Sequence, residues 1–597
     1  MVASARMRAI RELPIVASLL LAGLALFFGG GPADGSVFWL GACALAAILV
    51  LLSTSGVPGG WPVIVPLGLL GVWCAVSIAW SGLPDRSWDY ANRTLVYALF
   101  AAVGLWGASR TRAVANGLAV LLGAVIVWSL LGKVVPFIYD YSGPDVTRLR
   151  GPIGLWNQLA LATAYALALA LALRGRLGAL LAYASLVALV LTYSRGGILT
   201  AGVVCVAWFV LADEQTESVV TLVAGALPAA VVGGIGFALP GITSDDQSAH
   251  TRWRDGLIFG ALLLVGALAT VLLTRLRRPT NAQQVRRAAA AVGLAGVVAA
   301  VVFVVVHGVG SGTVGNGSNR IASTSSNFRF TWWHQAWHGF VSHPLDGIGA
   351  GAFNLLNLKY RASYLDFTIE PHDLPVQMLA ELGVVGLALL VVAMALLIGR
   401  PRRRPRHELA LWLLLPAFLV HSLVDVDWDF IAVAAPAFLG AGALAGRPAE
   451  RRSGLVVLLP ATGVAVLLVG SLVSPWLARR WTNEAYAASP ARTVTLAKRA
   501  HSFDPLLVEP YWLKGDALES QGRERAGFVE FVAAVNRQPK NPQTWLFAGE
   551  YAKRANCPYL AYHYLERYTE LDPKSNGPGG DEYRAMLALV NKHAYTC

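Results

Sequence analysis

A series of apolar stretches, each long enough to cross a lipid bilayer as a helix, is the feature that most constrains how this chain folds. Since a crossing needs roughly 20 mostly apolar residues, about fifteen ranges qualify, give or take one or two. They are 13–30, 36–53, 62–80, 95–108, 113–132, 158–173, 177–193, 198–212, 219–240, 256–274, 288–307, 374–399, 409–424, 430–446 and 455–476. Only 14% of the residues are charged, whereas a soluble domain has about 25%. The sequence therefore predicts an all-α fold, a polytopic membrane helical bundle of about 14 ± 2 transmembrane helices.

Arginine clusters between these stretches predict the orientation. The linkers on the same side as Arg6, Arg8 and Arg11 contain the dense basic clusters Arg110/Arg112, Arg174/Arg176, Arg275 through Arg287, Arg400 through Arg406 and Arg447/Arg451/Arg452. Such clusters favour the cytoplasm, and Arg479-Arg480 is the one exception. The loops 81–94, 133–157, 194–197, 241–255, 308–373 and 425–429 and the C-terminus are then predicted to lie outside. Since most of the net charge of +13 resides in the clusters, nucleic acid is not expected as a partner.

After Trp476 the composition becomes that of a soluble helical domain. Several residues recur there with a period of 34: Pro505, Pro539 and Pro573; Gly515 and Gly549; Tyr511 and Trp545. This is the period of tetratricopeptide repeats. We therefore expect a membrane domain, 1–476, and an extracytoplasmic α-solenoid, 477–597, that folds by itself. Its concave face would dock a partner protein or a glycan, and the alternative is a cap over the membrane domain.

Cys557 and Cys597 both lie in this C-terminal domain. They could form a disulfide if the domain is extracytoplasmic, but their spacing does not establish the pairing.

Arginines in the external loops need an explanation, because topology does not favour them there. They are Arg86, Arg93, Arg148, Arg150, Arg195, Arg252, Arg254, Arg320, Arg329 and Arg361. Anion binding is one explanation, and a salt bridge with a loop acid is the other.

Arg195 is the strongest of these candidates. It stands between Ser194 and the pair Gly196-Gly197, where one apolar stretch ends and the next begins. A guanidinium makes paired hydrogen bonds to phosphate oxygens, and the two glycines would leave room for a bulky head group. The alternative is an arginine that extends to the lipid interface.

His372 precedes an apolar helix, with Asp373 as the expected N-cap and Pro375 in the first turn. The positive end of a helix disfavours imidazolium, so His372 is expected to be neutral near pH 7, as a general base requires. A histidine that anchors the helix end at the interface is the alternative.

Three further groups have a simpler structural explanation, and we favour it for the first two. His334, His338 and His343 have metal-like spacing, but the surrounding tryptophans favour aromatic packing over zinc. Asp425, Asp427 and Asp429 are interpreted as turn and cap residues that partner external arginines. Gly347, Gly349 and Gly351 are as consistent with a sharp turn as with a phosphate loop.

Together these segments resemble the O-antigen ligase and O-antigen polymerase superfamily of bacterial membrane glycosyltransferases. The matching motifs are Arg148-Leu149-Arg150-Gly151-Pro152 with Asn157, Ser194-Arg195-Gly196-Gly197, Phe328-Arg329-Phe330 with Trp333, and His343-Pro344 with Gly347-Ile348-Gly349. In the most diagnostic motif, a histidine is followed by Asn, Ser or Gln, nine further residues and Gly-x-x-Gly. His372, Gly383 and Gly386 fit it, whereas Asp373 departs from it.

The resemblance implies a metal-independent enzyme without a cofactor, a multi-pass protein of the cytoplasmic membrane that acts at its outer face in surface polysaccharide assembly. It would transfer a glycan from undecaprenyl-pyrophosphate to a hydroxyl of an acceptor lipid, glycan or protein. By position in the motifs, Arg195 and Arg329 would hold the pyrophosphate and His372 would activate the acceptor. The remaining substrate-binding candidates are Arg148, Arg150, Asn157, Arg320, Gly196 and Gly197.

Three alternatives remain. A repeat-unit polymerase or protein O-oligosaccharyltransferase would differ in its acceptor, and the C-terminal repeats favour relatives of those kinds. A lipid-glycan flippase should show charges in mid-span and a repeat of spans, and neither is evident here. A catalytically silent scaffold would use the repeats to gather envelope-assembly proteins.

Overall fold

The computed structural model describes residues 2–29, 34–138, 147–173, 175–213, 215–275, 280–307, 323, 325–400, 403–448, 454–575 and 578–591. Arg320, Cys597 and the segment 308–322 of the external loop lie outside these ranges. Helices make up 80% of the chain and the ranges contain no strand, so the all-α prediction is confirmed.

Every range expected from the sequence to cross the membrane falls on a helix. Among the described residues, seven helical stretches are long and apolar enough to cross: Gly35–Ser55, Trp61–Ala79, Ala108–Val134, Gln215–Phe237, Ala249–Leu273, Leu374–Ile398 and Leu455–Tyr486. Further apolar helices of 10–17 residues are Glu12–Phe28, Trp156–Ala172, Gly175–Leu191, Arg195–Leu211 and Ile431–Ala445. These apolar helices are those of a multi-pass membrane protein. The count of about 14 crossings stays a prediction.

The chain divides into two compact units. Unit 1 comprises Met1–Val65, Val96–Phe328 and Ala393–Gly463. Unit 2 comprises Pro66–Leu95, Arg329–Val392 and Val464–Cys597. Unit 2 therefore joins the C-terminal helices with the segment after Arg329 and with the start of α4 (Pro84–Leu105).

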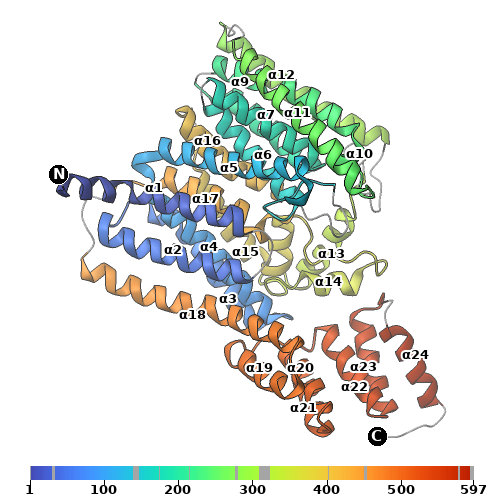
Figure 1. Ribbon diagram of the computed structural model, residues 1–597. Helices are drawn as coiled ribbons and strands as arrows, with labels where there is room; N and C mark the ends of the chain where they lie inside the picture. Colours follow the sequence, from blue (N-terminus) through green and yellow to red (C-terminus); the bar gives the residue numbers. More distant parts are fainter. Residues whose placement is uncertain are drawn as a thin grey trace. The chain divides into compact units, whose positions relative to one another are not determined.

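Helix α6 (Trp156–Ala172) lies in the interior of unit 1, with all residues from Gln158 to Leu171 buried. Its alanines lie in an apolar cluster with alanines of α7 and α8. Figure 1 shows α6 next to α7, on which it packs. Small side chains let helix backbones approach closely, which is how helices associate where lipid weakens the hydrophobic driving force. The helices of unit 1 besides α6 are α1 (Val2–Phe28), α2 (Asp34–Ser55), α5 (Thr111–Val134), α7 (Gly175–Leu191), α8 (Arg195–Leu211), α9 (Gln215–Phe237), α10 (Pro240–Thr243), α11 (Ala249–Leu273), α12 (Ala282–His307), α16 (Arg406–Ser422) and α17 (Ile431–Ala445).

Unit 2 is built from helices that lie far apart in the sequence. They are α3 (Val65–Val76), the start of α4, α13 (Arg329–Ser342), α14 (Phe353–Tyr360), most of α15 (Leu374–Ile398), α18 (Leu455–Tyr486), α19 (Pro490–Phe503), α20 (Glu509–Glu519), α21 (Glu524–Arg537), α22 (Pro542–Arg554), α23 (Pro558–Leu571) and α24 (Pro578–Asn591). From α19 to α24, each helix packs on the next one along the chain (Figure 1).

The 34-residue period reappears as repeated packing in these C-terminal helices. A Cβ added to Gly515 would lie 2.6 Å from the Phe531 ring, and one added to Gly549 would lie 2.8 Å from the Leu565 side chain. Both glycines therefore allow the next helix to approach, and the two pairs are related by the same spacing. The recurring prolines follow the ends of α19, α21 and α23, as expected.

Candidate functional site

His372 lies immediately before α15 in an unusual backbone conformation. Its φ is 55°, in the left-handed region that non-glycine residues rarely adopt. Its ring stacks on Trp332 of α13, with centroids 4.9 Å apart and planes inclined by 24°. The Trp332 indole in turn donates a hydrogen bond of 2.6 Å to Asp366, and Trp333 donates one of 3.1 Å to the Pro371 carbonyl. Two tryptophans of α13 thus fix the segment that carries His372.

Asp373 forms the N-cap that the sequence predicts. Its Oδ1 accepts a hydrogen bond of 2.8 Å from the Val376 amide, in the first turn of α15. Burial raises the pKa of the Asp373 carboxyl above its ordinary value. Asp373 therefore performs by its own carboxylate the capping that Asn or Ser would perform there.

Arg329 opens α13, one helical turn before Trp332. Residues three apart lie on the same face of a helix, so Arg329 shares the α13 face that meets His372. The two residues before it, Asn327 and Phe328, have φ of 54° and 63°. The backbone therefore turns sharply just before α13, and Arg329 lies in the first turn of the helix.

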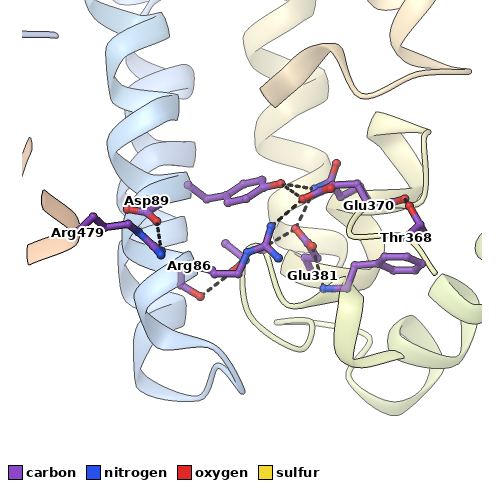
Figure 2. A network of polar contacts seen from close by, with 12 residues as sticks. Arg86, Asp89, Thr368, Glu370, Glu381 and Arg479 are labelled. Atoms are coloured by element: carbon purple, nitrogen blue, oxygen red, sulfur yellow. Dashed lines mark hydrogen bonds and ion pairs between the residues drawn. The ribbon is translucent and has the colours of Figure 1, made fainter. Parts of the chain in front are cut away.

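Glu370, two residues before His372, is held by two donors from α4. Its Oε1 accepts hydrogen bonds from Arg86 at 2.9 Å and from the Tyr90 hydroxyl at 2.8 Å. Figure 2 shows Arg86 extending from α4 toward Glu370 and Glu381. Gln377 of α15 donates to Tyr90 at 3.1 Å and to Glu381 at 3.3 Å. Arg86 thus forms a salt bridge with a loop acid, which is the alternative to anion binding considered in the sequence analysis.

Helix α15 is interrupted at Gly383, the first glycine of the Gly-x-x-Gly motif. Gly383 has φ 66° and ψ −165°, and a Cβ there would lie 2.2 Å from the Leu345 carbonyl oxygen. The interruption allows the preceding loop to pair with the helix backbone: Ile348 donates to the Ala380 carbonyl and Val384 donates to that of Pro344. The motif is therefore needed for the fold of this loop.

The three loop glycines, Gly347, Gly349 and Gly351, do not form a phosphate loop. Their amides donate to the His343 carbonyl, the Glu381 carbonyl and the Glu381 carboxylate respectively. All three have positive φ, between 69° and 106°. Because protein acceptors already receive these N–H groups, the sharp-turn interpretation holds.

The histidines of α13 pack as aromatic residues. The rings of His334 and His338 are 4.8 Å apart, and His338 stacks on Tyr360 at 4.7 Å. His343 lies exposed after the helix, and its Nδ1 is 3.0 Å from the Ser342 hydroxyl. Among the described residues, no three His, Cys, Asp or Glu side chains are grouped to hold a metal ion.

Arg195 lies in unit 1, at the start of α8. Ser194 caps this helix by accepting a hydrogen bond from the Gly197 amide at 3.2 Å. The Arg195 guanidinium donates to the carbonyls of Ser323 and Ser325, the latter at 2.8 Å. Arg195 therefore holds the backbone at Ser323 and Ser325, a few residues before α13 in the sequence.

The two glycines after Arg195 serve packing. A Cβ at Gly197 would lie 2.3 Å from that of Ala160 in α6, and one at Gly196 would lie 3.0 Å from Val424. The expected space for a head group is thus filled by protein at these Cβ positions.

Arg148 belongs to the interior of unit 1. It is 1% exposed, donates to the Thr192 carbonyl at 3.0 Å and lies 4.0 Å above the Trp156 ring. It also reaches Asn157 at 3.4 Å. A side chain buried in this way is a structural element, and the substrate-facing position expected for it is not observed. Arg150 beside it is partly exposed.

The aspartates after α16 bind amide and imidazole groups of unit 1. Asn157 and Gln158 donate to Asp425, and Asp427 lies 2.7 Å from His421 Nδ1. The contacts are buried and join the start of α6 to the end of α16. These aspartates act as the expected turn residues, with partners that include amides and a histidine.

Sequence reasoning missed Glu370, Tyr90 and Glu381. Glu370 is two residues from His372, and this proximity could have indicated from the sequence that it belongs to the site. The α4 partner lies 280 residues away from it, so only the fold reveals the pair.

Comparison with known families matches residues 251–391 to the O-antigen ligase family model. The match supports the O-antigen ligase superfamily. The segment contains Arg329, His372, Gly383 and Gly386, and it supports a membrane glycosyltransferase of O-antigen ligase or polymerase type. A search of curated proteins found no significant match.

Proposed function

We propose that the protein transfers a glycan from undecaprenyl-pyrophosphate to an acceptor hydroxyl at the outer face of the cytoplasmic membrane, as an O-antigen ligase does. The observation that carries this proposal is the placement of His372. Its backbone is held in a left-handed conformation and its ring stacks on Trp332, which lies on the same face of α13 as Arg329. Strained residues of this kind persist where surrounding contacts over-determine them, often at functional sites.

The chemistry needs few groups. Departure of a pyrophosphate requires positive charge at the phosphates, and attack by the hydroxyl requires a proton acceptor. Arg329 and Arg195 would supply the charge, and His372 would accept the proton from the acceptor hydroxyl as that oxygen attacks the sugar carbon. No step calls for a metal ion or a cofactor.

A second candidate is repeat-unit polymerisation or protein O-glycosylation, in which only the acceptor differs. It is favoured by the repeated helices α19 to α24, which we interpret as tetratricopeptide-like. Such helices present a concave face that suits a peptide or glycan acceptor.

The test is a transfer assay with purified protein and lipid-linked glycan. His372→Ala should lower transfer by about 10²–10⁴-fold, the usual contribution of a general base, while lipid-carrier binding is retained. His250→Ala, at an exposed histidine that belongs to none of the family motifs, serves as the control and should leave transfer unchanged.

Two results would count against the proposal. Full activity of His372→Ala would remove the base from the mechanism. Activity that is lost with a chelator and restored by a divalent cation would show that the reaction uses a metal.

A further inference from the structure

A cavity of about 570 Å³ opens in unit 1, at the end of α6 remote from its contacts with Asp425 and Asp427. Its polar lining comes from Arg112, Asn116, Asp213, Arg406 and His407. Its apolar lining comes from Ala115, Leu169, Ala172, Leu173 and Pro405. The cavity therefore combines cations, a carboxylate and an apolar wall.

The cavity lies on the opposite side of unit 1 from the Asp425–Asn157 network. Helices α6 and α16 each have 17 residues, which corresponds to a length of about 25 Å. The start of α6 and the end of α16 contribute to the network, whereas the end of α6 and the start of α16 line the cavity. By the arginine pattern this is the side that carries the basic clusters, so the cavity serves a different purpose from glycan transfer.

The cationic part of the cavity is suited to a phosphate. Helices α5 and α16 both begin at it, and the residues at their N-caps, Arg110 and Pro405, form no side-chain capping bond. Helix N-termini carry a partial positive charge and N–H groups that favour anions. Arg406 is fixed by a salt bridge of 2.8 Å to Glu217, and Arg112 is exposed.

The positive and negative charges at the cavity nearly balance, and this limits the kinds of ligand that it can bind. Asp213 and Glu217 oppose the two arginines, so a ligand with a net negative charge would gain little from the whole cavity. A ligand that bears one anion and one cation would satisfy both parts. The cavity volume is within the range for organic ligands and is large for a bare phosphate.

We propose that this cavity binds a phosphoethanolamine group, with its phosphate at Arg112 and the helix N-termini and its primary ammonium at Asp213. A phospholipid headgroup is one source of this chemistry, and a soluble phosphoethanolamine is the other. The apolar wall formed by Leu169 and Leu173 suits the glycerol and upper acyl carbons of the lipid.

The experiment is native mass spectrometry of the full-length protein with equimolar phosphatidylethanolamine, phosphatidylcholine and phosphatidylglycerol. We expect phosphatidylethanolamine to be retained best, because a quaternary ammonium has no N–H to donate to Asp213. Arg112→Gln should lower its retention about ten- to a hundredfold, the effect of losing one charged hydrogen bond. Asp213→Asn should shift the preference toward phosphatidylglycerol.

Arg176→Gln is the matched control, since Arg176 is an exposed arginine that does not line the cavity. Equal effects of Arg112→Gln and Arg176→Gln would overturn the proposal, as would a preference of the unsubstituted protein for phosphatidylglycerol or phosphatidylcholine. Thermal stabilisation by free phosphoethanolamine, lost in Arg112→Gln, would identify the soluble source, and stabilisation by lipid alone the membrane source. Unchanged melting without ligand would show that the variants fold.

Discussion

Helix α6 of unit 1 and helix α15 of unit 2 are fixed in their surroundings by different means. In unit 1, α6 is an uninterrupted helix whose alanines pack on neighbouring helices. In unit 2, α15 is broken at Gly383, and long-range polar contacts hold the surrounding segments: Arg86 with Glu370, Glu381 with Gly351, and Arg361 with Asp572. The small residues of the two helices thus differ in role, because the alanines of α6 allow close packing and Gly383 interrupts α15. The unit with the interrupted helix also carries the strained His372.

The largest effect should come from Gly383→Ala, which tests whether the interruption of α15 determines the fold of unit 2. Its φ of 66° and ψ of −165° lie in a region that is essentially confined to glycine, where an L-residue costs about 1–3 kcal/mol, and the added Cβ would also collide with the backbone at Leu345. We expect a loss of more than about 3 kcal/mol, or failure to fold.

Gly399→Ala is the control for this substitution. Gly399 has a similar φ of 63°, but no atom lies within 4 Å of its added Cβ. The Gly399→Ala variant should lose only about 1–2 kcal/mol of folding stability, the cost of an L-residue at positive φ. Equal melting temperatures of the two variants would mean that the loop does not depend on the interruption.

Arg361→Ala should have the next largest effect. Arg361 follows α14 and forms a salt bridge of 2.6 Å with Asp572, which follows α23, and both side chains are less than 10% exposed. Removing one partner of a buried pair costs about 3–5 kcal/mol, because the other charge stays buried alone. Arg361→Ala with Asp572→Ala should therefore cost less than the two single changes added together.

A surface pair in the same helices provides the comparison. Arg554 and Glu519 are 44% and 25% exposed, so Arg554→Ala should cost at most about 1 kcal/mol. If Arg361→Ala costs no more than that in thermal unfolding, the C-terminal helices are held by other contacts. The sequence-based expectation that residues 477–597 fold alone would then gain support.

The difference between the units also explains what could be predicted from the sequence. Helix positions followed from apolar length, and the C-terminal glycines followed from their 34-residue period. The N-cap at Asp373 involves only residues close in the sequence, so the local sequence pattern was enough to predict it. The break at Gly383 was not foreseen, because it depends on pairing with a loop, Pro344 to Gly349, that lies earlier in the chain. Arg148 resembled an exposed anion ligand for the same reason, since only the fold shows that it is buried.

Arg148→Gln and Arg195→Lys should separate a structural arginine from a functional one in unit 1. Arg148 is buried and bonds the Thr192 carbonyl, so its loss should lower stability by about 1.5–3 kcal/mol. Lysine at position 195 keeps the charge and a donor for the carbonyl of Ser323 or Ser325, but it lacks the fork that binds phosphate. We therefore expect transfer to fall about 10²–10³-fold with a smaller change in melting temperature than that of Arg148→Gln. Transfer by Arg195→Lys at the normal rate would contradict the role proposed for Arg195.

The smallest effect concerns Asp85, a buried acid of unit 2 outside the apolar part of α4. Burial, and secondly Glu509, raise the pKa of Asp85 to about 6 from an ordinary 3.8. The folded state therefore binds the proton more tightly than the unfolded state, so stability falls as pH rises from about 4 through 6 and stays reduced above that range. Asp85→Asn removes the cost of ionising this carboxyl and keeps an oxygen to accept the hydrogen bond from Gln538.

We therefore expect Asp85→Asn to raise stability at pH 8 by about 1–3 kcal/mol, at 1.36 kcal/mol per pKa unit, and to raise it little at pH 4. Loss of the contact between Asp85 and Arg479, 3.7 Å long, offsets part of the gain. The pKa of Asp504 is also raised to about 6, partly by Asp85, so neutralising Asp85 relieves Asp504 as well. The double variant Asp85→Asn with Asp504→Asn should gain less than the sum of the single variants. Thermal unfolding of the variant and of the unsubstituted protein at pH 4 and pH 8 tests this prediction. A lower stability of Asp85→Asn at pH 8 would show that the contact with Arg479 stabilises the fold by more than the burial of the Asp85 charge destabilises it.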